Sequence, residues 1–416
     1  MKMHVYLSNS RRNLTLLSIA VACLFGASIG WADTYPFSDK ATGDWNGVRA
    51  RMVEAGITPL LFYDADLLSN PVGGQNQSAA YAASLLGELT FDLEKIIGSN
   101  GLSFHISVSW DQGRDLSQDD IGNYFIAAET YVDNVLRLAK VYFEQDLWHD
   151  NLQIKLGKIP VGDGFASDNF YANYVNAAVN PNPLSLQNDV PSFTSDPLAN
   201  LGIQASVSSD TNLYLSAGVF NADPSVQAPH KHGLDFSMDL NRGVLMIGEF
   251  GYDVDYLEGQ GRLPGHFAVG AFMDTGKYEN LNNPENSSYK NFGYYVMGRQ
   301  MVYQEHGEQG LSLWAVATLF PKQGINAVPF AAYGGLSYKG LFPTRDEDIT
   351  AAAAYLAQFS EELEGQNFEL VWEVNHRVQF TKWSYLTADL QYISNPSGRG
   401  DIDDAVVVGL EFLIDF

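Results

Sequence analysis

AVVVGLEFLIDF, residues 405–416, closes the chain and decides its fold. Every second residue from Val406 to Phe416 is large and apolar, and Glu411 and Asp415 lie on the opposite phase. Strict alternation over this length predicts a strand with one apolar and one polar face, where many domains end in a frayed tail. The free edge of such a strand must be paired if its apolar face meets lipid. The stretch therefore favours a closed sheet whose last strand pairs with its first.

The same period of two recurs along the chain beyond residue 57. Turn-forming sequences rich in glycine, asparagine, proline and serine separate the alternating stretches. Because no shift in composition divides this region, we expect a single all-β domain at residues 58–416. The clearest predicted strands are residues 101–110, 151–157, 233–240, 265–274, 310–320 and 368–380.

Alternation alone does not separate a soluble β-sandwich from a membrane barrel, because both folds have one apolar and one polar face. The predicted strands approach the length of about 9–11 residues that crosses a bilayer at a tilt. Tyrosine and tryptophan recur near strand ends, as at Trp383 and Tyr392, where interfacial girdles lie. Glu373 and Arg377 stand mid-strand on a polar face, which suits a water-filled lumen. We therefore predict an all-β fold, an antiparallel transmembrane β-barrel.

Residues 1–32 contain, in sequence, the three regions of a secretory signal peptide. A basic start precedes an apolar stretch at residues 14–29, and a small-residue site ends at Ala32, after which we predict cleavage. Cys23, the one cysteine of the chain, lies inside the apolar stretch, and a lipid-modified N-terminus at this residue is the alternative. The favoured cleavage leaves an exported chain without a disulfide.

Residues 33–57 form a separate N-terminal segment, in which apolar residues such as Trp45, Val48 and Met52 lie near helical spacing. Asp44 is suited to cap this helix and Gly56 to end it. We expect a short amphipathic helix that packs at the periplasmic mouth of the barrel or just inside its lumen.

The formal net charge of −25 argues against a nucleic-acid partner, whose phosphates bind lysine and arginine. Other groupings of polar residues are weak signals. His230 and His232 offer too few ligands for a metal site, and a polar loop is the favoured interpretation. A calcium site would suit the ligand type of three loop acids, Asp163, Asp168 and Asp189. These residues lack a calcium-loop pattern, so the favoured interpretation is that they are solvated acids of the loop. We predict no metal, no cofactor and no enzymatic activity.

Seven motifs carry a resemblance to a known family. They are TGDWNGVRARMVEAGI at residues 42–57, LGKIPVGDGFASDNFYANYVNAAVNPNP at residues 156–183, GVFNADPS at residues 218–225, HGLDFSMDL at residues 232–240, PGHFAVGAFMDTGKY at residues 264–278, AVPFAAYGGLSYKGLFPTRDED at residues 327–348 and LTADLQYISNPSG at residues 386–398. In these motifs, and in their order, the chain resembles the carbohydrate-selective porins of the OprB type. The likeness extends over nearly all of the predicted mature chain.

This resemblance implies a barrel of about 16 strands in the bacterial outer membrane that passes small sugars by diffusion. It also implies that Phe416 is the terminal aromatic recognised by the outer-membrane assembly machinery. Partners expected on this basis are outer-membrane lipid and lipopolysaccharide, and two further copies in a homotrimer, as in many porins. Family members are expected to constrict the pore with arginines and acids. The candidate pore-lining residues are Arg137, Glu144, Gln145, Lys155, Lys158, Glu369, Glu373 and Arg377.

Two other functions remain open from the residues. The acidic balance suits a general or cation-preferring diffusion pore of the same architecture, because a negative lumen concentrates cations. A secreted, soluble β protein that binds carbohydrate is the more distant alternative, for which the sequence offers no catalytic constellation.

Overall fold

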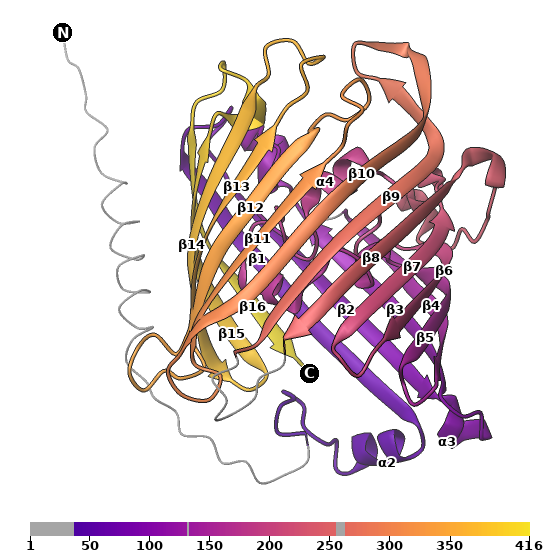
Figure 1. The fold of residues 1–416 in the computed structure, drawn as a ribbon. Coiled ribbons are helices and arrows are strands. Elements are labelled where there is room, and N and C mark those ends of the chain that lie inside the picture. Colours follow the sequence, from indigo (N-terminus) through magenta and orange to yellow (C-terminus); the bar gives the residue numbers. More distant parts are fainter. Residues whose placement is uncertain (1–36, 131–132, 255–262) are drawn as a thin grey trace.

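The computed structural model describes residues 37–130, 133–254 and 263–416, so the predicted signal peptide lies outside the described residues. Within these ranges sixteen antiparallel strands form one closed barrel in chain order (Figure 1). The strands are β1 Ile57–Val72, β2 Ala79–Asp92, β3 Leu102–Gly113, β4 Val135–Leu147, β5 Leu152–Ile159, β6 Asn200–Ser208, β7 Leu213–Asn221, β8 Val244–Val254, β9 Gly265–Asn280, β10 Asn283–Gln304, β11 Gly310–Leu319, β12 Phe330–Lys339, β13 Ile349–Gln358, β14 Phe368–Thr381, β15 Ser384–Ser394 and β16 Ala405–Asp415. The predicted fold class is confirmed.

The C-terminal stretch is the closing strand that its alternation predicts. β16 pairs with β1 in an antiparallel register that sets Asp66 opposite Glu411. The pairing continues to the chain end, where the Phe416 backbone N–H donates to the Leu61 carbonyl at 2.8 Å. This seam leaves no free sheet edge within the described strands, as lipid requires.

One predicted strand is wrong. Residues 233–240 alternate as a strand does, yet they adopt no strand in the structure and connect β7 to β8. β7 and β8 pair directly with each other, so no sheet edge between them is free. The preceding residue, His232, instead accepts a hydrogen bond from the Leu138 N–H of β4 at 3.0 Å. The apolar residues of the row are exposed, namely Leu234, Phe236, Met238 and Leu240.

The N-terminal helix α2, Val48–Glu54, is shorter than its predicted range because glycines with positive φ stand on either side of it. Gly47 has φ 84° at its start, and Gly56 has φ 87° just after its end. The N-cap is Gly47, which offers no side-chain cap, so the prediction that Asp44 takes this position is wrong. Asp44 lies three residues earlier, and its Oδ1 accepts a hydrogen bond from the Ala50 N–H in the first turn at 2.8 Å.

The segment around α2 is fastened to the end of β16. Arg49 is buried, and its guanidinium donates to the Phe416 carbonyl at 2.6 Å and to the Gly43 carbonyl at 3.0 Å. The guanidinium also lies 4.2 Å from the centre of the Trp45 ring, and Lys40 forms an ion pair with Asp415. α2 therefore lies at the barrel mouth beside the C-terminus (Figure 1).

The two ends of the barrel differ in their connections. Short turns, α3 (Leu93–Ile97), α2 and the C-terminus lie at one end, and most of the longer connections rise from the other (Figure 1). In transmembrane β-barrels the short turns face the periplasm and the longer loops face outward. No helix among the described residues is long and apolar enough to span a membrane.

The outer surface of the wall is apolar in the manner of a lipid-facing band. Large apolar side chains alternate outward along the strands, for example Leu67 of β1, Leu136 of β4 and Trp372 of β14, each more than half exposed. Charged residues such as Asp66, Glu373 and Glu411 take the opposite phase and are almost fully buried inside the barrel.

Two connections from the long-loop end fold into the barrel. Residues 114–130, here called the first inner loop, follow β3 and contain a π-helical turn, Ser117–Ile121. Residues 160–199, the second inner loop, join β5 to β6. The second loop carries the short helix α4, Leu184–Asp189, and the 3₁₀ turns Val161–Asp163 and Asn169–Asn173.

Candidate functional site

The first inner loop is held by a wall carboxylate of β14. Glu369 is fully buried and accepts hydrogen bonds from the backbone N–H groups of Tyr124 at 2.7 Å and Phe125 at 2.8 Å. It also accepts one from the Ser397 N–H of the β15–β16 connection at 2.6 Å. A single carboxylate thus replaces the water that three backbone donors would otherwise bind.

The second inner loop is held in the same way by acids from opposite parts of the wall. Glu373 of β14 accepts from the Val175 N–H at 2.8 Å, and Glu249 of β8 accepts from the Ala166 N–H at 2.8 Å. Asp189 of the loop itself accepts from the N–H groups of Ala327 at 2.6 Å and Val328 at 2.9 Å, in the β11–β12 connection. These contacts fix the loop across the lumen.

Aromatic packing fills the space between these loops and the later strands. Phe125 of the first inner loop lies edge-on to Tyr333, with ring centres 5.7 Å apart. Tyr174 of the second loop packs against Trp314 at 5.3 Å, and its hydroxyl accepts the indole N–H at 2.6 Å. The lumen beside β8 to β15 is therefore a packed core.

The remaining open space lies against the early strands. A cavity of about 330 Å³ is lined by Lys140, Lys155, Asp163 and Asp168, among others. A second cavity of about 170 Å³ is lined by wall residues of β1 to β3 together with both inner loops. Both cavities contact Pro181, so they adjoin. We take this polar space as the candidate passage.

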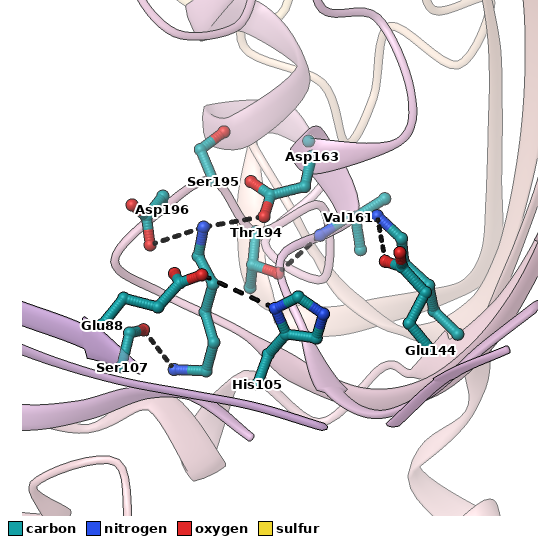
Figure 2. Close-up of polar contacts among 12 residues, drawn as sticks. Glu88, His105, Ser107, Glu144, Val161, Asp163, Thr194, Ser195 and Asp196 are labelled. Carbon is teal, nitrogen blue, oxygen red and sulfur yellow. Dashed lines mark hydrogen bonds and ion pairs between the residues drawn. The ribbon is translucent and has the colours of Figure 1, made fainter. Parts of the chain in front are cut away.

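An ion-pair triad stands where the two cavities adjoin. The Lys140 ammonium of β4 lies 2.8 Å from Asp163 Oδ2 and 3.6 Å from Asp196 Oδ1 (Figure 2). Asp163 and Asp196 belong to the two ends of the second inner loop, so one lysine ties both to the wall. Burial raises the pKa of the Asp196 carboxyl to about 6, and the ammonium of Lys140 opposes that rise.

A second polar pair continues the passage along the wall. His105 of β3 lies 3.6 Å from Glu88 of β2 (Figure 2). The same imidazole stacks on the Tyr142 ring with centres 4.5 Å apart. Glu144 of β4 pairs with Lys155 of β5 at 3.4 Å. The wall therefore carries acids and bases within a few residues of one another, with the buried Tyr142 ring beneath them.

Arg299 of β10 meets the second inner loop at Asp168, which lines the larger cavity. Its Nε donates to Asp168 Oδ2 at 2.7 Å, and its guanidinium lies 5.4 Å from the centre of the Phe170 ring. Charges of both signs thus face the space that the loop leaves open.

The structure places the eight candidate residues in three kinds of position. Glu144 and Lys155 meet at the passage, and Arg137 is buried inside the barrel, 3.6 Å from Asp111. Glu369 and Glu373 hold the inner loops. Arg377 also does so, because it donates to the Ala172 carbonyl of the second inner loop.

Gln145 and Lys158 lie away from the passage. Each shares its phase with an exposed apolar residue of its own strand, Phe143 or Leu156. Lys158 is nevertheless buried, because the β7–β8 connection covers it. The Gln145 side chain donates to the Asn100 carbonyl at the short-turn end, and the Lys158 ammonium donates to the Gly233 carbonyl in the β7–β8 connection. Contact of any of the eight candidates with sugar stays a prediction.

Four residues that line the passage were not among the candidates: Lys140, Asp163, Asp168 and Asp196. Neither were the nearby Glu88, His105 and Arg299, which line neither cavity. Lys140 could not be recognised from the sequence, because the β3–β4 pairing has a register shift between Leu138 and Lys140. After this shift the residues of β4 that point into the barrel belong to the other alternating set. The loop acids Asp163, Asp168 and Asp189 do not converge as a metal site would require, since each has its own protein partner.

Comparison with known proteins gives one consistent family. A family model described as "Carbohydrate-selective porin, OprB family" matches residues 76–416. Porin B of Pseudomonas aeruginosa is 24% identical over 444 residues, which cover 94% of this chain and 96% of that protein. The putative porin QuiX of Acinetobacter baylyi is 22% identical over 449 residues, or 97% of this chain and 100% of that protein.

The fold has a solved counterpart. The high-pH structure of Pseudomonas putida OprB superposes with a TM-score of 0.84 at 24% sequence identity. The superposition covers 93% of this chain and 100% of that one, so the barrel and its connections are similar over almost their whole length.

Proposed function

We propose a function from one premise: this chain belongs to the carbohydrate-selective porins of the OprB family. It is an outer-membrane β-barrel porin for the passive diffusion of carbohydrates. The observation that carries the proposal further is the narrow polar space between the second inner loop and the wall of β2 to β5. Sugars pass there, at the Lys140 triad.

The chemistry of this space suits an uncharged polyol. Sugar hydroxyls both donate and accept hydrogen bonds, and the carboxylates of Asp163 and Asp196 and the ammonium of Lys140 supply both partners. Because most charges are already paired with each other, sugar binding stays weak, as passage requires.

The confined space favours small sugars of monosaccharide size. Cavities of about 330 and about 170 Å³ meet at the triad, which ties the loop to the wall. Lys155, paired with Glu144, lines the larger cavity on the wall side, and Asp168, paired with Arg299, lines it on the loop side.

Solute-induced swelling of liposomes that contain the purified protein tests this function. We expect glucose to enter faster than a neutral amino acid of similar size, and a disaccharide to enter slowly. Replacing the wall pair with E144Q/K155Q should change the glucose rate, whereas K339Q, at a distant short turn, should not. Equal rates for glucose, the amino acid and a cation would exclude sugar selectivity.

A second candidate function is a cation-preferring pore of the same architecture. Asp64, Asp111, Glu129 and Asp196 all line the smaller cavity, and no basic residue does so among those described. A zero-current potential near zero in a KCl gradient would exclude this preference. The soluble carbohydrate-binding alternative is disfavoured by the apolar outer wall, and recovery in the soluble periplasm would revive it.

Export and assembly are further parts of the proposal. Residues 1–32 act as a cleaved signal peptide, and the barrel assembles as a homotrimer among outer-membrane lipid and lipopolysaccharide. Phe416 is the residue that the assembly machinery recognises, and its aromatic position at the end of the closing strand supports this role. Deleting Phe416 should lower the amount of folded barrel in cells far more than it changes a pore refolded in detergent.

A further inference from the structure

Three carboxylates from separate parts of the chain converge beside the barrel seam. Asp64 lies on β1, Glu411 on β16 and Glu129 on the first inner loop. One oxygen from each lies within 4.8 Å of the others, and no other such group occurs within the described residues. Asp66 stands two residues along from Asp64 and accepts the Thr130 hydroxyl at 2.6 Å.

Oxygens of this cluster lack hydrogen-bond donors although they are shut away from bulk water. Asp64 is 8% exposed, and Asp66 and Glu411 are each 1% exposed. Asp64 Oδ1, Asp66 Oδ1 and Glu411 Oε2 accept no hydrogen bond from the part of the chain that the structure describes. A buried carboxylate oxygen without a partner is costly, so each of these atoms calls for a cation or a proton.

Protein cations do not balance the cluster. Among the described contacts, Arg377 is the basic residue that reaches it, with Nη2 3.7 Å from Glu411 Oε2. The same guanidinium donates to the Ala172 carbonyl and lies 3.9 Å from the centre of the Tyr385 ring. One shared guanidinium therefore faces four carboxylates, and the ionised cluster keeps an excess of negative charge.

The smaller lumen cavity gives access to the cluster. Asp64 and Glu129 both line this space of about 170 Å³, together with Asp111 and Asp196. A hydrated cation can therefore reach the carboxylates from the passage, attracted by the further acids, and keep some of its water ligands there.

We propose that Asp64, Glu129 and Glu411 bind one divalent cation, and that Ca²⁺ is the ion that fits. The donors are all carboxylate oxygens, as hard cations prefer, and Asp66 adds a neighbouring charge. Ca²⁺ accepts irregular geometries with mixed carboxylate and water ligands, whereas Mg²⁺ requires a near-ideal octahedron. None of these three carboxylates belongs to the Lys140 triad, although Asp196 of the triad lines the same smaller cavity, and the site does not depend on the sugar that passes.

The cation clamps the first inner loop to the seam that closes the barrel. Asp66 and Glu411 are opposite each other in the β1–β16 pairing, and Glu129 comes from the loop. With Ca²⁺ bound, the loop is tied to both strands at once. Without it, the carboxylates repel one another and Glu129 moves away, which widens the smaller cavity.

Isothermal titration of CaCl₂ into the chelator-treated, detergent-purified full-length protein tests the site. We expect one Ca²⁺ per chain for the wild type and at least a ten-fold weaker affinity for D64N/E129Q. The control is E361Q/E364Q, which removes two exposed loop carboxylates and should bind Ca²⁺ as the wild type does. The heat-modifiable shift on electrophoresis confirms that each variant is folded.

Single-channel recording gives a second readout. Adding a chelator should raise the conductance of the wild type and leave that of E129Q unchanged, because without Glu129 a cation no longer ties the first inner loop to the wall. Wild-type protein that takes up no Ca²⁺ would overturn the proposal in favour of a proton shared by Asp64 and Glu129. Equal uptake by the wild type and the double variant would also overturn it, since the ion would then bind elsewhere.

Discussion

Replacing Lys140 by glutamine removes the one base of the triad and leaves both of its loop carboxylates in place. The Lys140 ammonium lies 2.8 Å from Asp163 and 3.6 Å from Asp196, at the junction of the two cavities. Glutamine keeps much of the side-chain length and can still donate a hydrogen bond to one acid. The change is therefore mainly one of charge.

The size of the effect follows from the distance at which an ion passes. A unit charge about 4 Å away contributes about 1 kcal/mol in a medium as polar as water, and salt near 0.1 M screens little over that distance. This energy changes the local concentration of an ion about five-fold. We therefore expect K⁺ to enrich about five-fold at the triad in K140Q and Cl⁻ to fall by the same factor.

The zero-current potential of a single channel in a KCl gradient measures this change. The zero-current potential of K140Q should lie closer to the potassium equilibrium potential than that of the wild type. Raising the salt concentration should reduce this difference. K339Q is the matched control, because Lys339 pairs with Glu308 at 2.8 Å and Glu347 at 2.9 Å near a short turn, away from the passage.

The opposite results would be decisive. If K140Q and the wild type have the same potential, ions do not pass beside the triad, and the passage lies elsewhere in the barrel. If K339Q shifts as much as K140Q, the potential reports the net charge of the protein and carries no information on the triad. A folded barrel, shown by the heat-modifiable band, is required of both variants.

Three further predictions concern the contacts that hold the loops and the termini. E369Q exchanges an acceptor for a donor among three backbone N–H groups, which should weaken docking of the first inner loop by about 2 kcal/mol, or about 30-fold, and raise single-channel conductance. R49A removes a buried guanidinium from the Phe416 carbonyl, so the free energy of unfolding should fall by about 2–3 kcal/mol, seen as a lower heat-induced unfolding temperature. R51A, at an exposed position, should leave that temperature almost unchanged. Burial raises the pKa of Asp189 from 3.8 to about 7, so its contribution to stability is present below about pH 4 and is lost as the pH rises to 7. The drop in unfolding temperature between pH 5 and pH 8 should therefore be smaller in D189N than in the wild type, and equal drops would contradict this reasoning.

The alternating pattern predicted most of the wall because each strand separates lipid from lumen. The row opposite Phe368 and Trp372 in β14 carries Glu369, Glu373 and Arg377, and all three lie inside the barrel. The alternating pattern wrongly predicted a strand at residues 233–240. Alternation indicates that a segment has one apolar face, but it does not show whether a sheet edge is free to pair with that segment, and β7 and β8 pair with each other.

The candidate site was less predictable than the wall for two physical reasons. A register shift in β4 brings Lys140 inward although Leu136, on the same phase in the sequence, points outward. The loop acids Asp163 and Asp196 gain their role from contacts across the barrel, which local sequence does not encode.

The sequence by itself determined the alternating strands and predicted their closure, because AVVVGLEFLIDF has the period of a strand and a strand in lipid must be paired on both edges. The tertiary structure alone decided where the passage runs. Buried acids such as Glu369 and Glu373 bind the backbone of the two inner loops and fill the lumen beside the later strands. Such long-range hydrogen bonds depend on the closure of the whole sheet, so they have no signature in any one stretch of the chain.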